Sequence, residues 1–169
     1  RAWLNHAGPK PVAMAGHSLG EYTALVCSGA LDFAAAIDLV RFRGQVMQQA
    51  VPLGQGAMAA VLGLDDEQVA DACREAEQGE VVEPVNFNSP GQVVIAGNAT
   101  AVARAMEAAK ARGAKRAVTL PVSVPSHSRL MMGAAERLAE RLASVEVRMP
   151  DVPSVYTVDV KTHASPDGI

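Results

Sequence analysis

The chain has 169 residues, of which 49% are hydrophobic and 20% are charged, a composition typical of a globular protein with a buried core. Its formal net charge is -3, from 15 basic and 18 acidic residues, so no positive excess predicts binding to nucleic acid or to an anionic membrane. No signal peptide is visible and the apolar runs are too short to cross a bilayer, so we expect a cytoplasmic protein.

The first part of the chain predicts a strand followed by two helices. Residues 11–15 (Pro-Val-Ala-Met-Ala) form a short apolar run, typical of a buried parallel strand. A helix is expected over residues 21–28, ended by Gly29. Asp32 is then expected to cap a second helix, which Pro52 stops. The apolar side chains of this second helix fall on one stripe, formed by Phe33, Ile37, Val40, Met47 and Val51.

The middle of the chain predicts a β-α-β-β-α-β succession. We expect strands over residues 56–64, 81–87, 92–96 and 116–122, and helices over residues 65–78 and 100–112. The second and third strands are expected to join through a turn at residues 88–91 (Asn-Ser-Pro-Gly). This order is that of a ferredoxin-like unit, inserted here into a larger α/β domain.

A Gly-x-Ser-x-Gly pattern, from Gly16 to Gly20, lies between the first expected strand and the first expected helix. A sharp turn at this point would lift the Ser18 hydroxyl clear of the sheet, and the two glycines would let the flanking backbone pass close by. The N–H groups at the start of the helix, including that of Leu19, can then stabilise an oxyanion. The alternative is a serine that only caps an ordinary helix.

A serine nucleophile needs a base, and the chain has four histidines. The ring of His17 is not expected to reach the hydroxyl of its neighbour Ser18 on such a tight turn. His6 and His163 lie in polar segments near the ends of the chain, where solvated histidines are usual. His127 lies in a loop directly after an apolar strand, where α/β folds place their chemistry, and it is the preferred base.

Spacing does not assign the third member of a triad. Asp151 and Asp159 follow His127, but neither lies in a recognisable motif. A backbone carbonyl can orient the imidazole instead, which would make a Ser–His dyad. The two cysteines, Cys27 and Cys73, lie among apolar residues and are expected to be buried, reduced thiols.

Three segments carry a longer pattern: residues 16–22 (Gly-His-Ser-Leu-Gly-Glu-Tyr), residues 85–97 (Val-Asn-Phe-Asn-Ser-Pro-Gly-Gln-Val-Val-Ile-Ala-Gly) and residues 121–127 (Pro-Val-Ser-Val-Pro-Ser-His). Together they resemble the bacterial malonyl-CoA:acyl-carrier-protein transacylases of type II fatty-acid synthesis. The resemblance implies a hydrolase-like α/β domain, incomplete at both ends, that carries an inserted ferredoxin-like βαββαβ subdomain. Residues 1–52 and 124–169 would form the large domain, and residues 53–123 the small one.

The resemblance also implies a role for individual residues. Ser18 matches the nucleophile, His127 matches the base, and the backbone of Leu19 matches an oxyanion donor. Arg43 matches the arginine that binds the malonyl carboxylate, and Asn88 falls in a segment that borders the cleft of the family.

The pattern of the second helix alone does not single out Arg43. Arg41 and Arg43 lie near opposite edges of its apolar stripe, and either residue could be a surface cation. The resemblance chooses Arg43. The chemistry explains why an arginine suits this role, since a planar guanidinium matches a carboxylate in two parallel hydrogen bonds.

The activity implied is transfer of a malonyl group from malonyl-CoA to the thiol of acyl carrier protein through a malonyl-serine, by a monomer that needs no metal or redox cofactor. The carrier proteins of such systems are acidic, so a basic cluster is a candidate docking surface. A favourable arrangement of charges at a helix C-terminus explains the same cluster equally well. The cluster comprises Lys110, Arg112, Lys115 and Arg116.

Three other functions share part of this pattern. A serine esterase or thioesterase would pass the acyl group to water, and an acyltransferase domain of a large synthase would do the same chemistry in another context. A non-catalytic carrier-binding module would have an unreactive Ser18 or His127. The Gln-Gly-x-Gly loop and the C-terminal stretch of the family are not found in this sequence, so we expect a fragment with impaired activity on its own.

Overall fold

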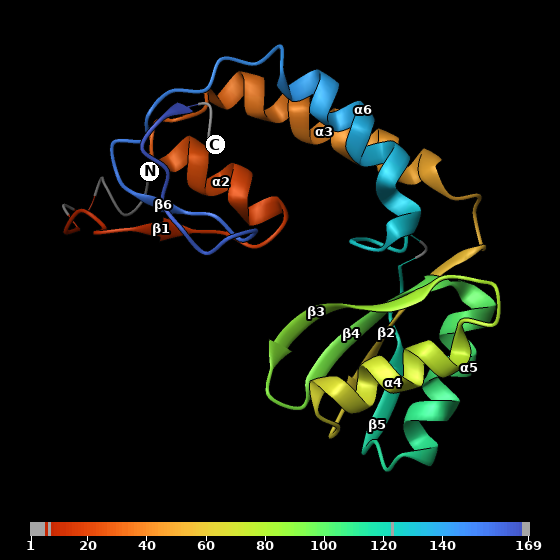
Figure 1. Ribbon diagram of the computed structural model, residues 1–169. Helices are drawn as coiled ribbons and strands as arrows, with labels where there is room; N and C mark the ends of the chain where they lie inside the picture. The colour runs from red at the N-terminus through yellow and green to blue at the C-terminus, as the bar shows by residue number, and fades with distance from the viewer. Residues whose placement is uncertain (1–5, 7, 123, 167–169) are drawn as a thin grey trace. The chain divides into compact units, whose positions relative to one another are not determined.

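The computed structural model describes residue 6, residues 8–122 and residues 124–166 (Figure 1). The chain forms two compact units, one from residues 1–42 with 141–169 and the other from residues 43–140. Both units combine helices with strands, so the predicted α/β class is confirmed. The domain boundaries expected after residues 52 and 123 stay a prediction.

The first unit contains a two-stranded parallel sheet and the helix that follows its first strand. Strand β1 (Met14–Ala15) pairs with β6 (Ser154–Val155), and helix α2 (Leu19–Cys27) comes directly after β1. The strand expected over residues 11–15 is therefore present only at its last two residues, the two that pair with β6.

Hydrogen bonds join the segment before β6 to the end of α2. The backbone N–H of Asp151 donates to the carbonyl of Ser28 at 2.7 Å. The buried hydroxyl of Ser154 donates to that of Ser28 at 3.3 Å. Gly29, which follows Ser28, has a φ of 80°, the left-handed conformation that favours glycine after a helix, so the predicted end of this helix is confirmed.

Helix α3 (Phe33–Ala50) begins directly after the predicted cap, Asp32. The Asp32 carboxylate accepts the backbone N–H groups two and three residues further on, at 2.9 and 3.1 Å. Two side chains of the predicted apolar stripe, Phe33 and Ile37, are 67% and 53% exposed. The buried side chains of this helix include Ala36, Leu39 and Val46.

The second unit contains a four-stranded antiparallel sheet with two helices packed on one face (Figure 1). The strand order across the sheet is β3-β4-β2-β5. All six elements lie where the sequence predicts them, with small shifts at their ends. In chain order they are β2 (Gly56–Leu62), α4 (Asp66–Ala76), β3 (Val82–Ser89), β4 (Gln92–Asn98), α5 (Ala99–Ala111) and β5 (Arg116–Thr119).

Alternation along β4 divides the core of this unit between the two faces of the sheet. Val93 and Ile95 belong to the large buried cluster on the face that the helices cover. Val94 and Ala96 belong to a smaller cluster with Met58 on the other face. Only 4% of the residues are aromatic, so small side chains fill much of this core. Small side chains also let the helices approach the sheet closely. The small helical residues of the large cluster include Ala72, Ala76, Ala101, Ala105 and Ala109.

A short 3-10 helix, η1 (Arg129–Met131), leads into helix α6 (Met132–Leu142). This helix lies outside the elements predicted from the sequence. Met131 and Ala134 are buried, and Leu138 is half-buried. Apolar residues at these spacings of three and four are the periodic signal that predicts an amphipathic helix.

A capping box closes the N-terminus of α4. The Asp65 carboxylate accepts the backbone N–H of Gln68 at 2.8 Å, and the Gln68 side chain accepts that of Asp65 at 3.2 Å. We expect Asp65→Ala to lower the free energy of unfolding by about 1 kcal/mol, because an N–H of the first turn loses its acceptor. Asp65→Asn keeps an acceptor oxygen and should match the wild type in chemical denaturation. Equal destabilisation by both variants would contradict this role.

Candidate active site

Ser18 occupies a strained turn between β1 and α2. Its φ is 54° and its ψ is -109°, a backbone conformation that residues with a side chain rarely adopt. A Cβ on Gly16 would lie 2.0 Å from the carbonyl carbon and oxygen of Gly20, so only glycine fits at position 16. A Cβ on Gly20 would meet nothing within 4 Å. The predicted strand–turn–helix setting is therefore confirmed, but only the first of the two glycines is sterically required.

The turn continues without a break into α2. The N–H of Gly20 donates to the carbonyl of His17 at 2.9 Å, and the N–H of Glu21 donates to that of Ser18 at 3.2 Å. Leu19 is the first helical residue, so its N–H has no acceptor within the helix and lies at the positive end of the helix dipole. This arrangement can stabilise negative charge that develops beside Ser18.

The contact at Gly16 predicts a difference between the two glycines of the pattern. Gly16→Ala should lower the free energy of unfolding by at least about 2 kcal/mol, because the new methyl group would overlap backbone atoms. Gly20→Ala should be as stable as the wild type or more so, since its methyl group has open space in a helix. Thermal and chemical denaturation measure both effects, and a Gly16→Ala protein of wild-type stability would contradict the steric account.

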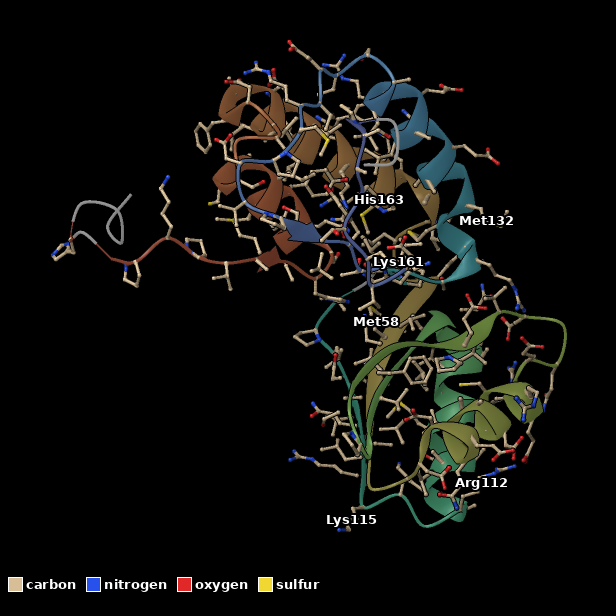
Figure 2. All side chains as sticks on the ribbon, turned by 60° about the vertical axis from the view of Figure 1, so that its left-hand side comes forward. Met58, Arg112, Lys115, Met132, Lys161 and His163 are labelled. Carbon is tan, nitrogen blue, oxygen red and sulfur yellow. The ribbon has the colours of Figure 1, made fainter. Side chains whose placement is uncertain are left out.

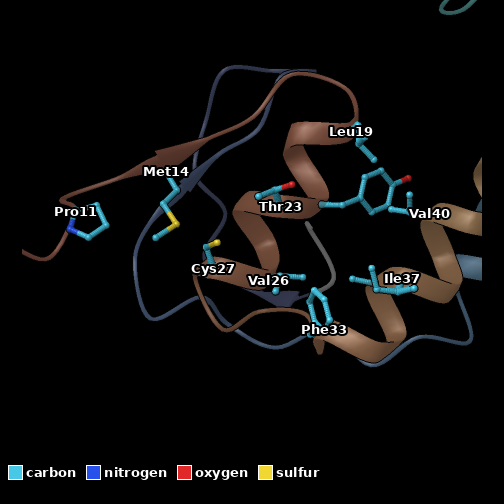
Figure 3. A pocket seen from close by; sticks show the side chains of 11 residues that line it. Pro11, Met14, Leu19, Thr23, Val26, Cys27, Phe33, Ile37 and Val40 are labelled. Carbon is cyan, nitrogen blue, oxygen red and sulfur yellow. The ribbon is translucent and has the colours of Figure 1, made fainter. Parts of the chain in front are cut away.

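An apolar groove of about 990 Å³ runs beside this turn within the first unit (Figure 3). Leu19, next to Ser18, lines the groove and is 51% exposed. Phe33 and Ile37 of α3 line it too, which explains why the predicted stripe of that helix is exposed. The periodicity of α3 indicated an apolar face, but it did not indicate that the face borders open space.

The expectation of two buried thiols is wrong for Cys27. This residue is exposed, because it lies on the face of α2 that lines the groove (Figure 3). Cys73 is buried beneath the sheet, and burial raises the pKa of its thiol to about 12. A thiol with that pKa stays protonated at neutral pH, so Cys73 is not a competing nucleophile.

His127 is exposed on a loop that is fixed on both sides. Its φ is 67°, so its backbone, like that of Ser18, is left-handed. Pro125 and Ser128 are buried, and the Ser128 hydroxyl donates to the carbonyl of Pro125 at 2.7 Å. The N–H of Met131 donates to the carbonyl of Ser128 at 2.9 Å, which connects the loop to η1. The loop therefore presents an exposed imidazole from an anchored backbone.

Ser18 lies in the first unit, whereas Arg43, Asn88 and His127 lie in the second, and each is placed within its own unit. The expected contact between the Ser18 hydroxyl and the His127 imidazole therefore stays a prediction. Within α3, Arg43 is half-buried and Arg41 is exposed. This difference favours Arg43 as the arginine with a specific role, which helical geometry alone did not decide.

Asn88 is exposed near the end of β3 rather than in a turn. The strands extend further than predicted, so the hairpin closes over Pro90 and Gly91. A register shift between Phe87 and Ser89 makes Asn88 the extra residue of a bulge. Its role as a cleft residue stays a prediction.

His163, labelled in Figure 2, is half-buried rather than the solvated histidine that its sequence context suggests. Its Nε2 lies 3.3 Å from Oδ2 of Asp159, and its ring centroid lies 5.0 Å from that of Tyr156. The carboxylate of Asp159 therefore has a histidine partner within its own unit. Asp151 lies beside Gly29, where a Cβ would come within 2.9 Å of its Oδ2.

Two residues of the basic cluster form ion pairs with glutamates of the same unit. Lys110 pairs with Glu107 at 2.7 Å, and Arg112 pairs with Glu75 at 2.6 Å. Arg112 also donates to a carbonyl in the last turn of α5 at 3.2 Å. Figure 2 shows Arg112 and Lys115 at the same end of the second unit. The carbonyl contact favours the helix-terminus interpretation for Arg112.

Within residues 6, 8–122 and 124–166, no three or more His, Cys, Asp or Glu residues are grouped so that they could hold a metal ion. None of the helices described in these ranges is long and apolar enough to span a membrane.

Comparison with known proteins gives one consistent family. The family described as acyl transferase domain matches residues 1–167. The chain is 60% identical over 169 residues to the malonyl CoA-acyl carrier protein transacylase of Escherichia coli, a match that covers 100% of this chain and 55% of that protein. The chain thus spans about half the length of the curated relatives it matches.

Solved structures agree with this similarity. A malonyl-transacylase in complex with its type II PKS acyl-carrier protein matches with a TM-score of 0.96 and 56% identity, over 99% of this chain and 54% of that chain. An acyl carrier protein S-malonyltransferase from Vibrio cholerae matches with a TM-score of 0.94 and 57% identity, over 99% of this chain and 55% of that chain.

Proposed function

Because the chain belongs to the acyl transferase domain family, we propose that it forms the central part of an enzyme that transfers malonyl groups from malonyl-CoA to acyl carrier protein. The observation that carries this proposal is the strained turn at Ser18, in a chain 60% identical to a malonyl CoA-acyl carrier protein transacylase. The similar transacylase bound to an acyl-carrier protein supports the choice of acceptor. We assign the reaction to fatty-acid synthesis in the bacterial cytoplasm.

The fold supports a finer class than α/β. Numbered 1 to 4 along the chain, the strands of the second unit are β2, β3, β4 and β5. Across the sheet, from β5 to β3, their order is 4-1-3-2, and neighbouring strands are antiparallel. With one helix after the first strand and one after the third, this is the pattern of a ferredoxin-like subdomain. We assign β1, α2 and β6 of the first unit to a hydrolase-like α/β domain, in which a nucleophile follows a strand and precedes a helix.

In the first half-reaction, His127 accepts the proton of the Ser18 hydroxyl while Oγ forms a bond to the thioester carbonyl carbon of malonyl-CoA. The negative charge on the carbonyl oxygen is stabilised by the N–H of Leu19, at the positive end of α2. The carbon–sulfur bond then breaks, and His127 returns the proton to the leaving thiolate. CoA departs and a malonyl ester remains on Ser18.

The second half-reaction reverses these steps with a different thiol. The phosphopantetheine thiol of acyl carrier protein gives its proton to His127, and its sulfur attacks the ester carbonyl carbon. The bond from that carbon to Oγ of Ser18 breaks, and the proton returns to Oγ. The malonyl group leaves on the carrier, and the enzyme regains its starting state.

Arg43 would set the choice of acyl group. A guanidinium stays charged at all physiological pH values and binds a carboxylate through two parallel hydrogen bonds. The half-buried position of Arg43 increases this selectivity, because an acetyl group in the same site would leave a partly desolvated charge without its partner.

Replacement of the nucleophile tests the proposed function. When the complete gene product is incubated with malonyl-CoA, the peptide that contains Ser18 should gain the mass of one malonyl group, and Ser18→Ala should abolish this gain. Ser144→Ala, which changes an exposed serine after α6, should be labelled like the wild type. Labelling of the Ser18→Ala protein at the wild-type level would refute the assignment. Discharge of the malonyl group to water in the presence of acyl carrier protein would favour a hydrolase.

The two arginines of α3 provide a matched pair for substrate choice. Arg43→Ala should reduce the ratio of kcat/KM for malonyl-CoA to that for acetyl-CoA by about 100-fold, because the malonyl carboxylate loses its partner. Arg41→Ala, on the exposed side of the same helix, should retain the wild-type ratio. If the ratio is unchanged in Arg43→Ala, this residue does not bind the carboxylate.

A further inference from the structure

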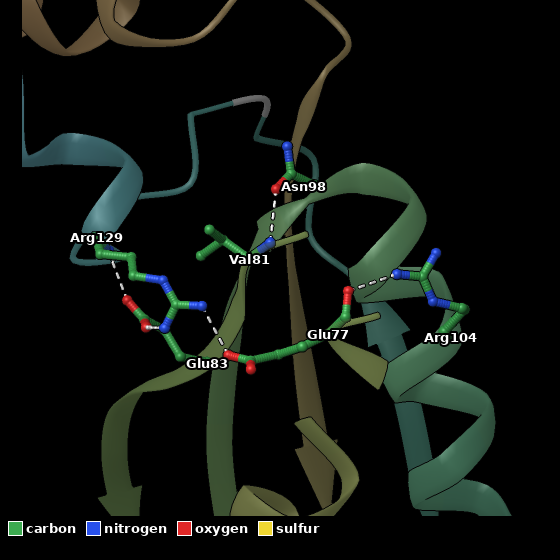
Figure 4. Close-up of polar contacts among 6 residues, drawn as sticks. All are labelled: Glu77, Val81, Glu83, Asn98, Arg104 and Arg129. Atoms are coloured by element: carbon green, nitrogen blue, oxygen red, sulfur yellow. Dashed lines mark hydrogen bonds and ion pairs between the residues drawn. The ribbon is translucent and has the colours of Figure 1, made fainter. Parts of the chain in front are cut away.

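Glu83 joins the edge strand of the second unit to the loop that carries His127 (Figure 4). Its Oε1 accepts the backbone N–H of Arg129 at 2.5 Å, and its Oε2 accepts from the guanidinium of the same residue at 3.2 Å. The carboxylate thus contacts both the backbone and the side chain of a residue two positions after His127. Hydrogen bonds to a charged acceptor are stronger than those between neutral groups.

A second carboxylate fixes the same arginine. The Arg129 guanidinium donates to Glu77 at 2.8 Å, so it bridges the end of α4 and strand β3 (Figure 4). Glu77 is itself held, since its backbone carbonyl accepts from Arg104 at 3.0 Å. Of the three side chains, that of Glu83 is the least exposed, at 26% against 37% for Glu77 and 48% for Arg129. Solvent and salt therefore screen the contacts of Glu83 least.

The start of β3, which carries Glu83, is also well fixed. The N–H of Val81 donates to the side chain of Asn98 at 2.8 Å (Figure 4). Gly97 lies so close to this point that a Cβ on it would be 2.0 Å from the carbonyl oxygen of Val81. Glu83 therefore projects from a segment that cannot shift without disturbing the neighbouring strand.

The loop needs such support because of its backbone. His127 has a φ of 67°, which a non-glycine residue keeps only where its surroundings hold it. The contacts of Ser128 with Pro125 and Met131 are local to the loop and to η1, so they fix its shape. The contact of Glu83 with Arg129 instead fixes the loop to the sheet.

We propose that Glu83 is a positioning residue for His127, which holds the loop through the backbone N–H of Arg129 and so sets the direction of the imidazole. This inference rests on the proposed function, in which His127 is the base. Glu83 touches neither substrate nor the reacting atoms in this account, and it acts through the backbone alone. The guanidinium contacts with Glu83 and Glu77 add a second attachment.

Single-turnover acylation by malonyl-CoA, followed by intact mass spectrometry of the complete gene product, tests this role before any carrier is added. Glu83→Ala should lower the maximal acylation rate by about tenfold, with the half-saturating malonyl-CoA concentration within about twofold of wild type, because a misplaced base slows proton transfer without weakening binding. Glu83→Gln keeps an acceptor for the Arg129 N–H and should stay within about threefold of the wild-type rate. Arg129→Ala keeps the backbone N–H and should behave like Glu83→Gln.

Glu75→Ala is the matched control, because it removes a carboxylate of the same unit that forms a 2.6 Å ion pair with Arg112. The Glu75→Ala protein should be acylated at the wild-type rate. Equal rates for Glu83→Ala and Glu75→Ala, or an equal loss in Glu83→Ala and Glu83→Gln, would overturn the proposal. Hydrogen exchange of the amides of residues 126–131 decides the matter without activity. These amides should exchange faster in Glu83→Ala than in Glu75→Ala, and unchanged exchange would refute the role. Absence of acylation in the wild type would contradict the proposed function instead.

Discussion

The approach of the Gly20 carbonyl group to Gly16 is the constraint on which the proposed site depends. It leaves no room for a side chain at position 16, in the turn between the end of β1 and the start of α2. The backbone of Ser18 is left-handed because it must complete the turn within this space. The first N–H of the helix, the proposed oxyanion donor, follows Ser18 directly, and Leu19 lines the apolar groove.

The second unit holds the proposed base, His127, by side-chain contacts rather than by a close backbone approach. Its sheet and helices form a core of small and β-branched residues. The carboxylates of Glu83 on β3 and Glu77 at the end of α4 accept from Arg129 and so attach the loop that bears His127 to this unit. Each unit therefore holds one member of the proposed dyad on a left-handed backbone. In the parts of the chain that the structure describes, the non-glycine residues with positive φ are Ser18, Gln78, His127 and Val160.

Local patterns predicted local structure well, because a few neighbouring residues decide it. The cap at Asp32 and the turn signal before Gly91 are examples. Periodicity identified the apolar face that includes Phe33 but not what covers that face, and Phe33 is exposed. The bond from Arg129 to Glu83 joins residues 46 positions apart on elements without a shared pattern, so no sequence signal could pair them. The resemblance to a family, rather than spacing, selected Arg43.

The left-handed backbone of His127 has an evolutionary consequence. Glycine or asparagine would relax that conformation, so the residue that the loop geometry favours differs from the one that the proposed chemistry needs. Selection for heat resistance alone would tend to remove the imidazole, whereas selection for turnover retains it. Position 127 is thus a site where stability and the proposed reactivity favour different residues.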